Sequence, residues 1–334
     1  MINTDKKYIN ASERIIKDYT LNRNDIVIAR SGSTGRMLLY KGIEEHLIFA
    51  SYLVRLKLSE KILPEYIFAF HKTTAYWQQV GALTKTLAQP NLNAERMKEI
   101  KIPLPQLDVQ KQIINKCEAV DQETDESRKT ITAAKQEIEE KVQAVINVGH
   151  EMKKIGDVYE TTSGGTPLSS KREYYENGTI PWINSGEVSK KEINFADHFI
   201  TESGLNNSNA KLFPPGTVLL AMYGATAGKV ALLNIEASTN QALCALLPTE
   251  EMAPKFLVLV IESMYQYLLN LRTGVARDNL SQEKIRNIRI PIPPLNIQQQ
   301  LAADVEQLEA KITEAQAVVD GATERKNAIL TKYL

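Results

Sequence analysis

Residues Ile102-Pro103-Leu104-Pro105-Gln106-Leu107 introduce a long polar segment in which apolar and small side chains recur every three or four positions. The recurring positions are Ile113, Cys117, Val120, Thr124, Ser127, Ile131, Ala134, Ile138, Val142, Val145 and Val148. This spacing puts them on one face of a helix and is typical of a helix that packs lengthwise against another helix. The pattern therefore predicts a helix from Leu107 to about Val148, long enough to separate two globular domains.

The same arrangement recurs near the C-terminus, where Ile290-Pro291-Ile292-Pro293-Pro294-Leu295 precedes a second periodic segment. Its positions are Leu301, Val305, Leu308, Ile312, Ala315, Val319, Ala322, Lys326 and Ile329. Both helix seams carry small or polar residues where a self-associating coiled coil would have Leu or Ile. We therefore predict that the two helices pair antiparallel with each other and offer further surface to other proteins.

The segments that precede the two helices also repeat each other. Each copy is predicted to contain two strands followed by a helix that begins with proline. These elements are predicted at Asp25–Arg30, Leu47–Arg55 and Pro64–Lys72 in the first copy, and at Gly216–Ala221, Asn240–Leu247 and Pro254–Leu268 in the second. A glycine turn follows the first strand of each copy, and polar loops are predicted at Gly81–Gln89 and Gly274–Asp278. A period near 190 residues is too long for a solenoid and indicates a duplicated unit of domain plus helix.

A mixed α/β (α+β) fold with a pseudo-two-fold repeat follows from this duplication. We predict four parts: a globular domain at residues 1–102, a helical spacer at 103–150, a second globular domain at 151–290 and a second spacer at 291–334. Tyr8-Ile9 aligns with Phe199-Ile200, so the first copy has no counterpart of roughly Glu151–Lys191. We therefore expect a first domain that is shortened at its front.

Composition narrows the class of protein. With 43% hydrophobic and 24% charged residues, the chain has material for globular cores. It has no run of about 18 apolar residues and no secretory signal, so a cytoplasmic protein without a membrane is expected. Cys117, Cys244 and four scattered histidines lack metal-ligand spacing, so no metal is expected. Lys and Arg outnumber Asp and Glu by 16 to 10 over residues 1–102, which favours a nucleic-acid face there.

No catalytic motif is present. The sequence has no Gly-Lys-Ser/Thr phosphate loop, no His-Glu-x-x-His, no Gly-x-Ser-x-Gly and no nicotinamide fingerprint. It also lacks the Asp/Asn-Pro-Pro-Tyr/Phe motif of adenine methyltransferases. Tyr223–Lys229 resembles a phosphate cradle, but its spacing differs and no hydroxyl follows its lysine. These absences disfavour a nucleotide-dependent enzyme.

The glycine turns are candidate DNA-facing loops. Their backbone N–H groups, hydroxyls and cations suit phosphate contacts, and an arginine can read guanine in the major groove. An ordinary β-turn whose glycines adopt positive φ would explain the same residues equally well. The candidates are Arg30, Ser31, Ser33, Thr34 and Arg36 in the first turn, and Tyr223, Thr226 and Lys229 in the second.

A second group of candidates lies outside these turns. The loop Gly164–Arg172 and the tyrosine after it mix hydroxyls, cations and aromatic rings, which adds Thr166, Ser169, Lys171, Arg172 and Tyr174. Lys85, Gln89, Lys190, Lys191, Arg272 and Arg277 are further surface candidates. Trp182, flanked by Ile180 and Ile183, is expected in the core instead.

The order of these motifs resembles that of the specificity (S) subunits of Type I restriction-modification systems. The matching segments are Gly164–Pro167, Ile180–Ile183, Pro215–Leu219, Gly224–Lys229 and Ile290–Gln300. The resemblance implies two target recognition domains, each reading one half of a bipartite site in double-stranded DNA. It also implies an antiparallel helix pair that sets the spacing and docks two methyltransferase (M) subunits, which motor-nuclease (R) subunits join.

In that family the S subunit is not an enzyme, and S-adenosylmethionine belongs to the M subunits, so no cofactor is expected in this chain. The shortened first domain departs from the family's plan. It leaves open whether this domain reads DNA alone or whether a second S chain completes it. The alternative from the residues themselves is a coiled-coil scaffold that binds only proteins.

Overall fold

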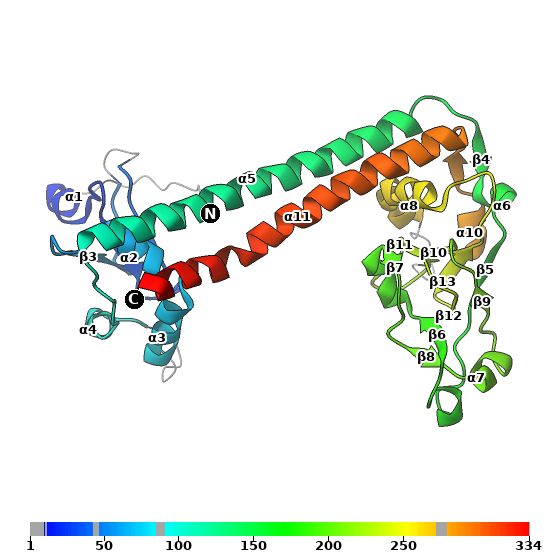
Figure 1. Cartoon of the computed structure of the whole chain (residues 1–334), viewed down its shortest axis with the longest axis horizontal. Helices are drawn as coiled ribbons and strands as arrows, with labels where there is room; N and C mark the ends of the chain where they lie inside the picture. Colours follow the sequence, from blue (N-terminus) through cyan, green and yellow to red (C-terminus); the bar gives the residue numbers. More distant parts are fainter. Residues whose placement is uncertain (1–9, 11, 43–46, 85–90, 272–278, 334) are drawn as a thin grey trace. The chain divides into compact units, whose positions relative to one another are not determined.

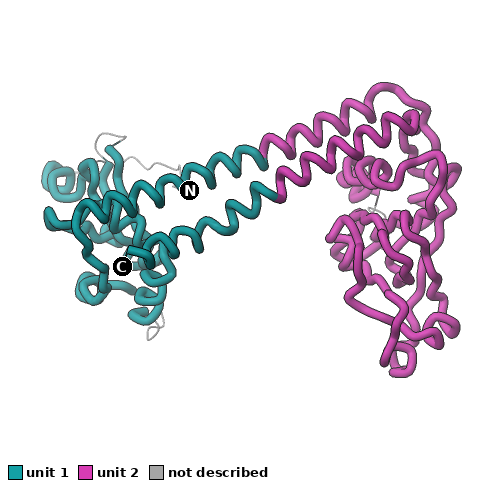
Figure 2. The backbone as a smooth tube through the Cα atoms, viewed as in Figure 1, with its two compact units in different colours: residues 1–131, 314–334 teal, residues 132–313 magenta. Residues whose placement is uncertain are grey.

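The chain forms two compact units. The computed structural model describes residues 10, 12–42, 47–84, 91–271 and 279–333. Unit 1 comprises residues 1–131 and 314–334, and unit 2 comprises residues 132–313 (Figure 2). Each unit combines a globular part with one end of both long helices. This division cuts the helices themselves, so the four-part division at residues 102, 150 and 290 stays a prediction.

The two long helices are α5 (Leu107–Ile146) and α11 (Leu295–Tyr333), which lie side by side (Figure 1). In unit 1, Asp121 pairs with Lys326, and in unit 2 Lys141 lies 2.9 Å from Asp304. Residue numbers rise along one helix as they fall along the other. The predicted antiparallel pairing of two long helices is therefore confirmed.

The buried face of each long helix follows the predicted spacing. On α5 the structure buries Ile113, Cys117, Val120, Thr124, Ala134 and Val142 and half-buries Ser127, Ile131, Ile138 and Val145; on α11 it buries Leu301, Val305, Leu308, Ala315, Ala322 and Lys326 and half-buries Ile312, Val319 and Ile329. Val148 is 70% exposed, because α5 ends at Ile146 and the chain turns at Gly149, whose φ is +82°. The predicted helix end was two residues too late.

Unit 2 contains three sheets among its described residues. The largest has the strand order β5-β13-β10-β11-β7, and the second has the order β8-β6-β12-β9. The bounds are β5 (Thr161–Ser163), β6 (Ile180–Ile183), β7 (Glu192–Ile193), β8 (Phe199–Ile200), β9 (Leu212–Phe213), β10 (Val218–Ala221), β11 (Val230–Leu233), β12 (Ala237–Thr239) and β13 (Leu243–Leu246). A third sheet pairs β4 (Met152–Lys154) with β14 (Arg289–Pro291).

Both faces of the five-stranded sheet are buried, so its central strands are apolar throughout. Leu220 and Leu232 pack with α8 (Pro254–Ser263) and α11, whereas Leu219 and Ala231 pack toward the four-stranded sheet. The remaining helical elements are α6 (Ile155–Val158), α7 (Glu202–Asn206), α9 (Tyr265–Leu271), α10 (Gln282–Arg286) and the 3₁₀-helices Arg172–Tyr174 and Ser185–Lys190. A single helix was predicted at Pro254–Leu268, but it is interrupted at Met264, whose ψ of 7° leaves the helical range.

Unit 1 repeats the centre of this architecture with a three-stranded sheet of order β2-β1-β3. Its elements are α1 (Glu13–Tyr19), β1 (Ile26–Ala29), β2 (Met37–Leu39), β3 (Leu53–Leu56), α2 (Pro64–Phe70), α3 (Thr74–Thr84) and α4 (Ala94–Lys98). All its strand pairs are antiparallel, as they are in β11-β10-β13. The mixed α/β fold and the pseudo-two-fold repeat are therefore confirmed.

Two predictions in unit 1 were wrong. The strand predicted at Leu47–Arg55 begins only at Leu53, because the N–H of Leu53 bonds back to the carbonyl of Ala50 and turns the chain. The polar loop predicted from Gly81 is helical up to Thr84, because Val80 and Leu83 pack on the core and carry the glycine within α3. Residues 85–89 of that loop, and the whole loop Gly274–Asp278, lie outside the described residues.

A fully buried glutamine joins each long helix to its globular part. The side-chain oxygen of Gln110 accepts a hydrogen bond of 2.8 Å from the N–H of Leu63, the residue before α2. Its side-chain nitrogen donates to the carbonyls of Lys61 and Pro105 at 2.8 and 2.9 Å. Both polar atoms of the Gln110 side chain thus have hydrogen-bond partners, as buried polar groups require.

Gln298 makes the same set of bonds in unit 2. It accepts from the N–H of Ala253, before α8, at 2.7 Å, and donates to Glu251 and Pro293 at 3.0 and 2.7 Å. Gln298 follows Gln110 by 188 positions, which is the offset of the repeat along the long helices. The duplication therefore extends to individual hydrogen bonds.

Candidate nucleic-acid interface

Three loops of unit 2 meet at one edge of the five-stranded sheet. The pairing register sets Ser163 at the end of β5 opposite Cys244 near the start of β13. It also sets Ala221 at the end of β10 opposite Leu243. The loops attached at these points therefore share an edge. We call Gly164–Pro167, Met222–Lys229 and Asn240–Ala242 the unit 2 loop edge.

The loop Gly164–Pro167 is held tightly against the protein. The N–H of Gly165 donates to the carbonyl of Thr239 at 2.9 Å, and the ring N–H of Trp182 donates to the carbonyl of Gly165 at 3.1 Å. A Cβ on Gly164 would lie 2.0 Å from the carbonyl oxygen of Thr239, so only glycine fits there. Trp182 is 8% exposed, which confirms its predicted place in the core.

A hydrogen-bonded cluster brings two of the predicted loops together. The hydroxyl of Thr166 donates to the amide oxygen of Gln241, and Gln241 also hydrogen-bonds the hydroxyl of Tyr223. Burial raises the pKa of Tyr223 and the bond from Gln241 lowers it, with a net rise, so the phenol stays protonated near neutral pH. Gln241 was not among the predicted site residues, because the sequence pattern placed it in a strand beginning at Asn240.

The glycine turn of unit 2 has the backbone that an ordinary turn would need. Gly224 and Gly228 have φ of +80° and +83°, which favours glycine. The N–H of Gly228 donates to the carbonyl of Ala221 at 2.9 Å. Thr226 is half-buried, and Lys229, which is exposed, reaches the hydroxyl of Ser189 at 3.3 Å. The turn interpretation is thus satisfied, and of the predicted residues only Lys229 is exposed at this turn.

Unit 1 has an equivalent edge, formed by Arg30–Arg36 and Ala50–Tyr52, which we call the unit 1 loop edge. Gly35, with φ of +83°, donates to the carbonyl of Ala29 at 2.8 Å, which matches the bond of Gly228 in unit 2. Of the five candidates here, Ser33 and Arg36 are exposed and Arg30, Ser31 and Thr34 are half-buried. Tyr52, 55% exposed, is an aromatic side chain at this edge that the sequence patterns did not single out.

The candidates that follow the Gly164–Pro167 loop are dispersed. Ser169 and Arg172 are exposed, and Arg172 lies 3.4 Å from Glu176. Tyr174 is buried, and its hydroxyl accepts a hydrogen bond of 3.0 Å from Lys171. Tyr174 therefore positions this segment with its ring and does not present that ring at the surface. Lys85, Gln89, Arg272 and Arg277 lie outside the described residues.

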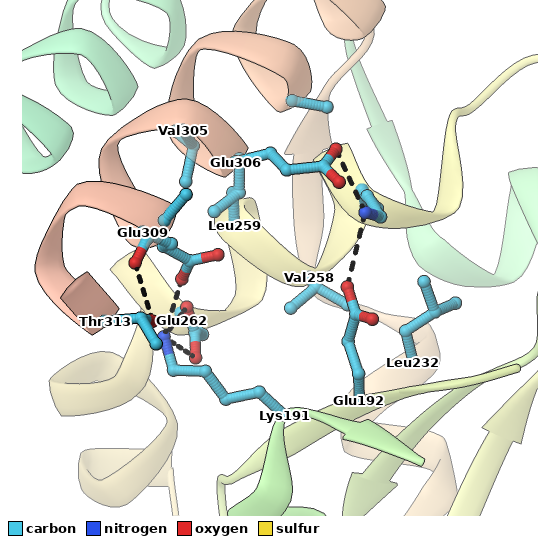
Figure 3. Close-up of a pocket in the computed structure, with 13 residues that line it drawn as sticks. Lys191, Glu192, Leu232, Val258, Leu259, Glu262, Val305, Glu306, Glu309 and Thr313 are labelled. Carbon is cyan, nitrogen blue, oxygen red and sulfur yellow. Dashed lines mark hydrogen bonds and ion pairs between the residues drawn. The ribbon is translucent and has the colours of Figure 1, made fainter. Parts of the chain in front are cut away.

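Lys190 and Lys191 are both paired with carboxylates. The ammonium group of Lys190 lies 2.7 Å from Asp197. Lys191 enters a groove of about 300 Å³ between α8 and α11, where its ammonium lies 3.1 Å from Glu262 and 3.5 Å from Glu309 (Figure 3). Burial lowers the pKa of Lys191. The two carboxylates, Glu262 and Glu309, raise it by a larger amount, so the net shift is upward.

Two other site types find no support in the described part of the chain. No group of three or more His, Cys, Asp or Glu side chains there could hold a metal ion. No helix among the described residues is long and apolar enough to cross a membrane.

One family model matches most of the chain. The family described as "Type I restriction modification DNA specificity domain" matches residues 2–140 and 147–318. The EcoR124I/EcoR124II specificity subunit of Escherichia coli is 30% identical over 156 residues, which are 45% of this chain and 39% of that protein. The MjaVIII specificity subunit of Methanocaldococcus jannaschii is 24% identical over 319 residues, covering 86% of this chain and 72% of that protein.

Solved structures share the fold at low sequence identity. A Type I restriction-modification S subunit from M. genitalium aligns with a TM-score of 0.61 at 15% identity, covering 95% of this chain and 84% of the other. The HsdS subunit from Thermoanaerobacter tengcongensis aligns with a TM-score of 0.51 at 17% identity, covering 94% and 81%. At these identities the likeness concerns the fold alone. The region matched in the E. coli relative is less than half of that relative's length.

Proposed function

This chain belongs to the Type I restriction modification DNA specificity family, and we propose that it recognises a DNA sequence on behalf of a methyltransferase complex. The observation that carries the proposal is the presence of two equivalent loop edges, one on each repeat. Each has the same backbone frame, with Gly35 and Gly228 bonded in the same way to the end of the preceding strand. Two matched edges suit two half-sites of one bipartite target.

The side chains at the two edges supply the two kinds of contact that DNA recognition requires. Arg36 and Lys229 are exposed cations suited to phosphates, which fix the register of a protein on DNA without reading sequence. Arg30 and Gln241 can form paired hydrogen bonds with base edges in the major groove. Within the described residues, the unit 2 loop edge has three loops and the unit 1 loop edge has two. We therefore propose that unit 2 reads the better defined half-site.

The paired helices would serve as spacer and as docking surface. The outward faces of α5 and α11 are polar and exposed along their length, so they remain available to partners. We propose two methyltransferase (M) subunits on these faces, with motor-nuclease (R) subunits joining the complex. S-adenosylmethionine would be bound by the M subunits, and this chain would contribute recognition without a cofactor or catalytic step. A cytoplasmic location follows from a role on cellular DNA.

Methylome sequencing of cells with and without this gene tests the proposal. The expected result is one bipartite N6-methyladenine motif that disappears with the gene, with one half defined and the other degenerate. An unchanged methylome would overturn recognition by this chain. A motif with two equally defined halves, produced with no second S chain present, would overturn the assignment of the better defined half to unit 2.

Binding measurements separate DNA recognition from the alternative of a protein-only scaffold. With the M-bound complex, Arg30→Ala combined with Arg36→Ala should weaken DNA binding. It should also lower the slope of log K against log salt, by about 0.9 for each phosphate that the variant no longer neutralises. Arg14→Ala removes an exposed arginine of α1 and serves as the matched control. A scaffold that binds only proteins would show equal DNA binding for the wild type, the double variant and the control.

A further inference from the structure

Gln241 occupies the centre of the unit 2 loop edge. Its side chain is exposed and contacts the two neighbouring loops, through Thr166 on one side and Tyr223 on the other. It therefore lies where a ligand that spans these loops would touch all three of them.

The backbone that carries Gln241 is held in place by the residue before it. The N–H of Asn240 donates to the carbonyl of Ile183 at 3.0 Å, and its side-chain oxygen accepts from the N–H of Ala242 at 3.1 Å. Its side-chain nitrogen donates to the side-chain oxygen of Asn184 at 3.2 Å. The base of the Gln241 side chain is thus fixed before any ligand arrives, which lowers the entropic cost of ordering it.

The amide of Gln241 is oriented by its partners and keeps capacity for a ligand. An amide offers two N–H donors and two lone pairs on its oxygen. Thr166 uses one lone pair. One N–H is used toward the hydroxyl oxygen of Tyr223, since the bond from Gln241 lowers the pKa of that phenol. Among the described residues, these contacts account for half of the hydrogen-bonding capacity of the Gln241 amide. One donor and one acceptor of the amide therefore remain for a ligand.

We infer that Gln241 reads an adenine in the half-site bound by unit 2; this rests on the proposed function. Adenine presents N7 as an acceptor and N6 as a donor in the major groove, and a glutamine amide matches this pair with its own donor and acceptor. Guanine offers two acceptors at the same edge, so it would meet the amide oxygen with a second acceptor. Thr166 and Tyr223 act as positioning residues that hold the amide plane.

The test is a specificity measurement on the complex of this chain with its M subunits, using a randomised DNA duplex library and sequencing of the bound fraction. Wild type should enrich a motif with adenine at one position of one half-site. Gln241→Ala should lose the preference at that position by about 5- to 150-fold and leave the other positions unchanged. Gln241→Glu should favour cytosine there, because a carboxylate accepts from the N4 amino group.

Gln266→Glu is the matched control, since Gln266 is an exposed glutamine of α9 in the same unit and the substitution adds the same charge. It should enrich the wild-type motif. If the wild-type complex enriches no motif, the proposed function itself fails. If wild type enriches a motif and both Gln241 variants keep every base preference, the function stands and the role of Gln241 is overturned. A uniform loss at all positions would also overturn it, because that result would indicate structural support only.

Discussion

The two units balance the same acidic position with cations from different parts of the chain. Asp121 on α5 and Glu309 on α11 are equivalent, being 188 residues apart. In unit 1, Lys72 lies just beyond the end of α2, and its ammonium nitrogen is 3.1 Å from a carboxylate oxygen of Asp121. In unit 2, the residue at the position of Lys72 is Glu262, and Lys191 provides the positive charge to both carboxylates.

This difference shows that equivalent acidic positions take their cationic partners from elements that are not equivalent. Lys191 ends the segment that has no sequence counterpart in the first copy. In unit 1 the positive charge comes from Lys72 and from Lys326 of α11, both of which pair with Asp121 of α5. Lys326 is 8% exposed. Asp121 therefore has two cationic partners, and neither comes from a segment equivalent to the one that carries Lys191. The following predictions test how far this equivalence of the two units extends.

The largest expected effect is on the buried glutamines. Gln110→Leu and Gln298→Leu each leave one N–H and two carbonyls without their side-chain partner, so each should lower the free energy of unfolding by about 3–5 kcal/mol. Urea unfolding of the full chain, with hydrogen exchange to show which unit opens, measures this. Gln299→Leu, at an exposed neighbouring position, is the control, with an expected effect within about 0.5 kcal/mol. Unequal losses for the two buried positions would argue against equivalence.

Alanine substitutions of the turn glycines should destabilise the protein to different degrees. Gly35→Ala places a Cβ 2.8 Å from Val80, whereas Gly228→Ala places one 3.3 Å from the ring of Tyr265. Both residues have φ of +83°, which costs a non-glycine residue about 1–2 kcal/mol. Thermal unfolding should therefore show Gly35→Ala as the more destabilised. Gly32→Ala, where the Cβ meets open space, isolates the conformational cost, and a loss there as large as at Gly35 would contradict the packing argument.

Neutralising the two equivalent acidic residues should lower stability by different amounts in the two units. Asp121→Asn leaves the buried ammonium of Lys326 without its carboxylate and should cost about 1–3 kcal/mol, reduced because Asp121 is itself partly exposed. Glu309→Gln, whose partner Lys191 is half exposed, should cost less than about 1 kcal/mol. Equal costs in chemical unfolding would mean that the two ion pairs contribute equally to stability and would contradict this prediction.

The Asp121 effect should also depend on pH. Burial raises the pKa of Asp121, but hydrogen bonds and charge from Lys326 and Lys72 outweigh it and lower the pKa below its usual value. A lowered carboxyl pKa contributes stability above the ordinary carboxyl range, and this is lost as pH falls through the lowered pKa. The difference in stability between wild type and Asp121→Asn should therefore shrink below about pH 4. A difference that is constant from pH 7 to pH 3 would contradict the ion pair.

The smallest expected effect is the loss of the two lysines that distinguish the units. Lys72→Ala and Lys191→Ala remove ion pairs of partly exposed side chains, so each should change the free energy of unfolding by about 0–1 kcal/mol. The change should shrink further in high salt, because salt screens exposed charges. Thermal unfolding at low and high salt measures both variants. A loss of several kcal/mol at Lys191 alone would show that unit 2 depends on its extra segment far more than the contacts indicate.

Local sequence patterns were enough to predict the long helices, whose buried positions recur every three or four residues. The three- and four-residue spacing from Ile113 to Val145 defines a buried helix face because a helix turns every 3.6 residues, whatever surrounds it. The same reasoning failed at Gly81, where packing of Val80 and Leu83 continues a helix through a glycine. It also failed at Leu47, where a turn delays the strand until Leu53. Tertiary contacts overrode local preference at both places.

The sequence by itself determined the duplicated plan and the antiparallel helix pair, because the repeated motifs and the small seam residues are visible along the chain. Only the tertiary structure decided which candidates share a site. Thr166 and Gln241 are 75 residues apart and meet because β5 and β13 pair in one register, while Lys191 is drawn into the groove by Glu262 and Glu309. A register shift of one residue would turn each side chain to the other face, and no local pattern specifies that register between distant strands.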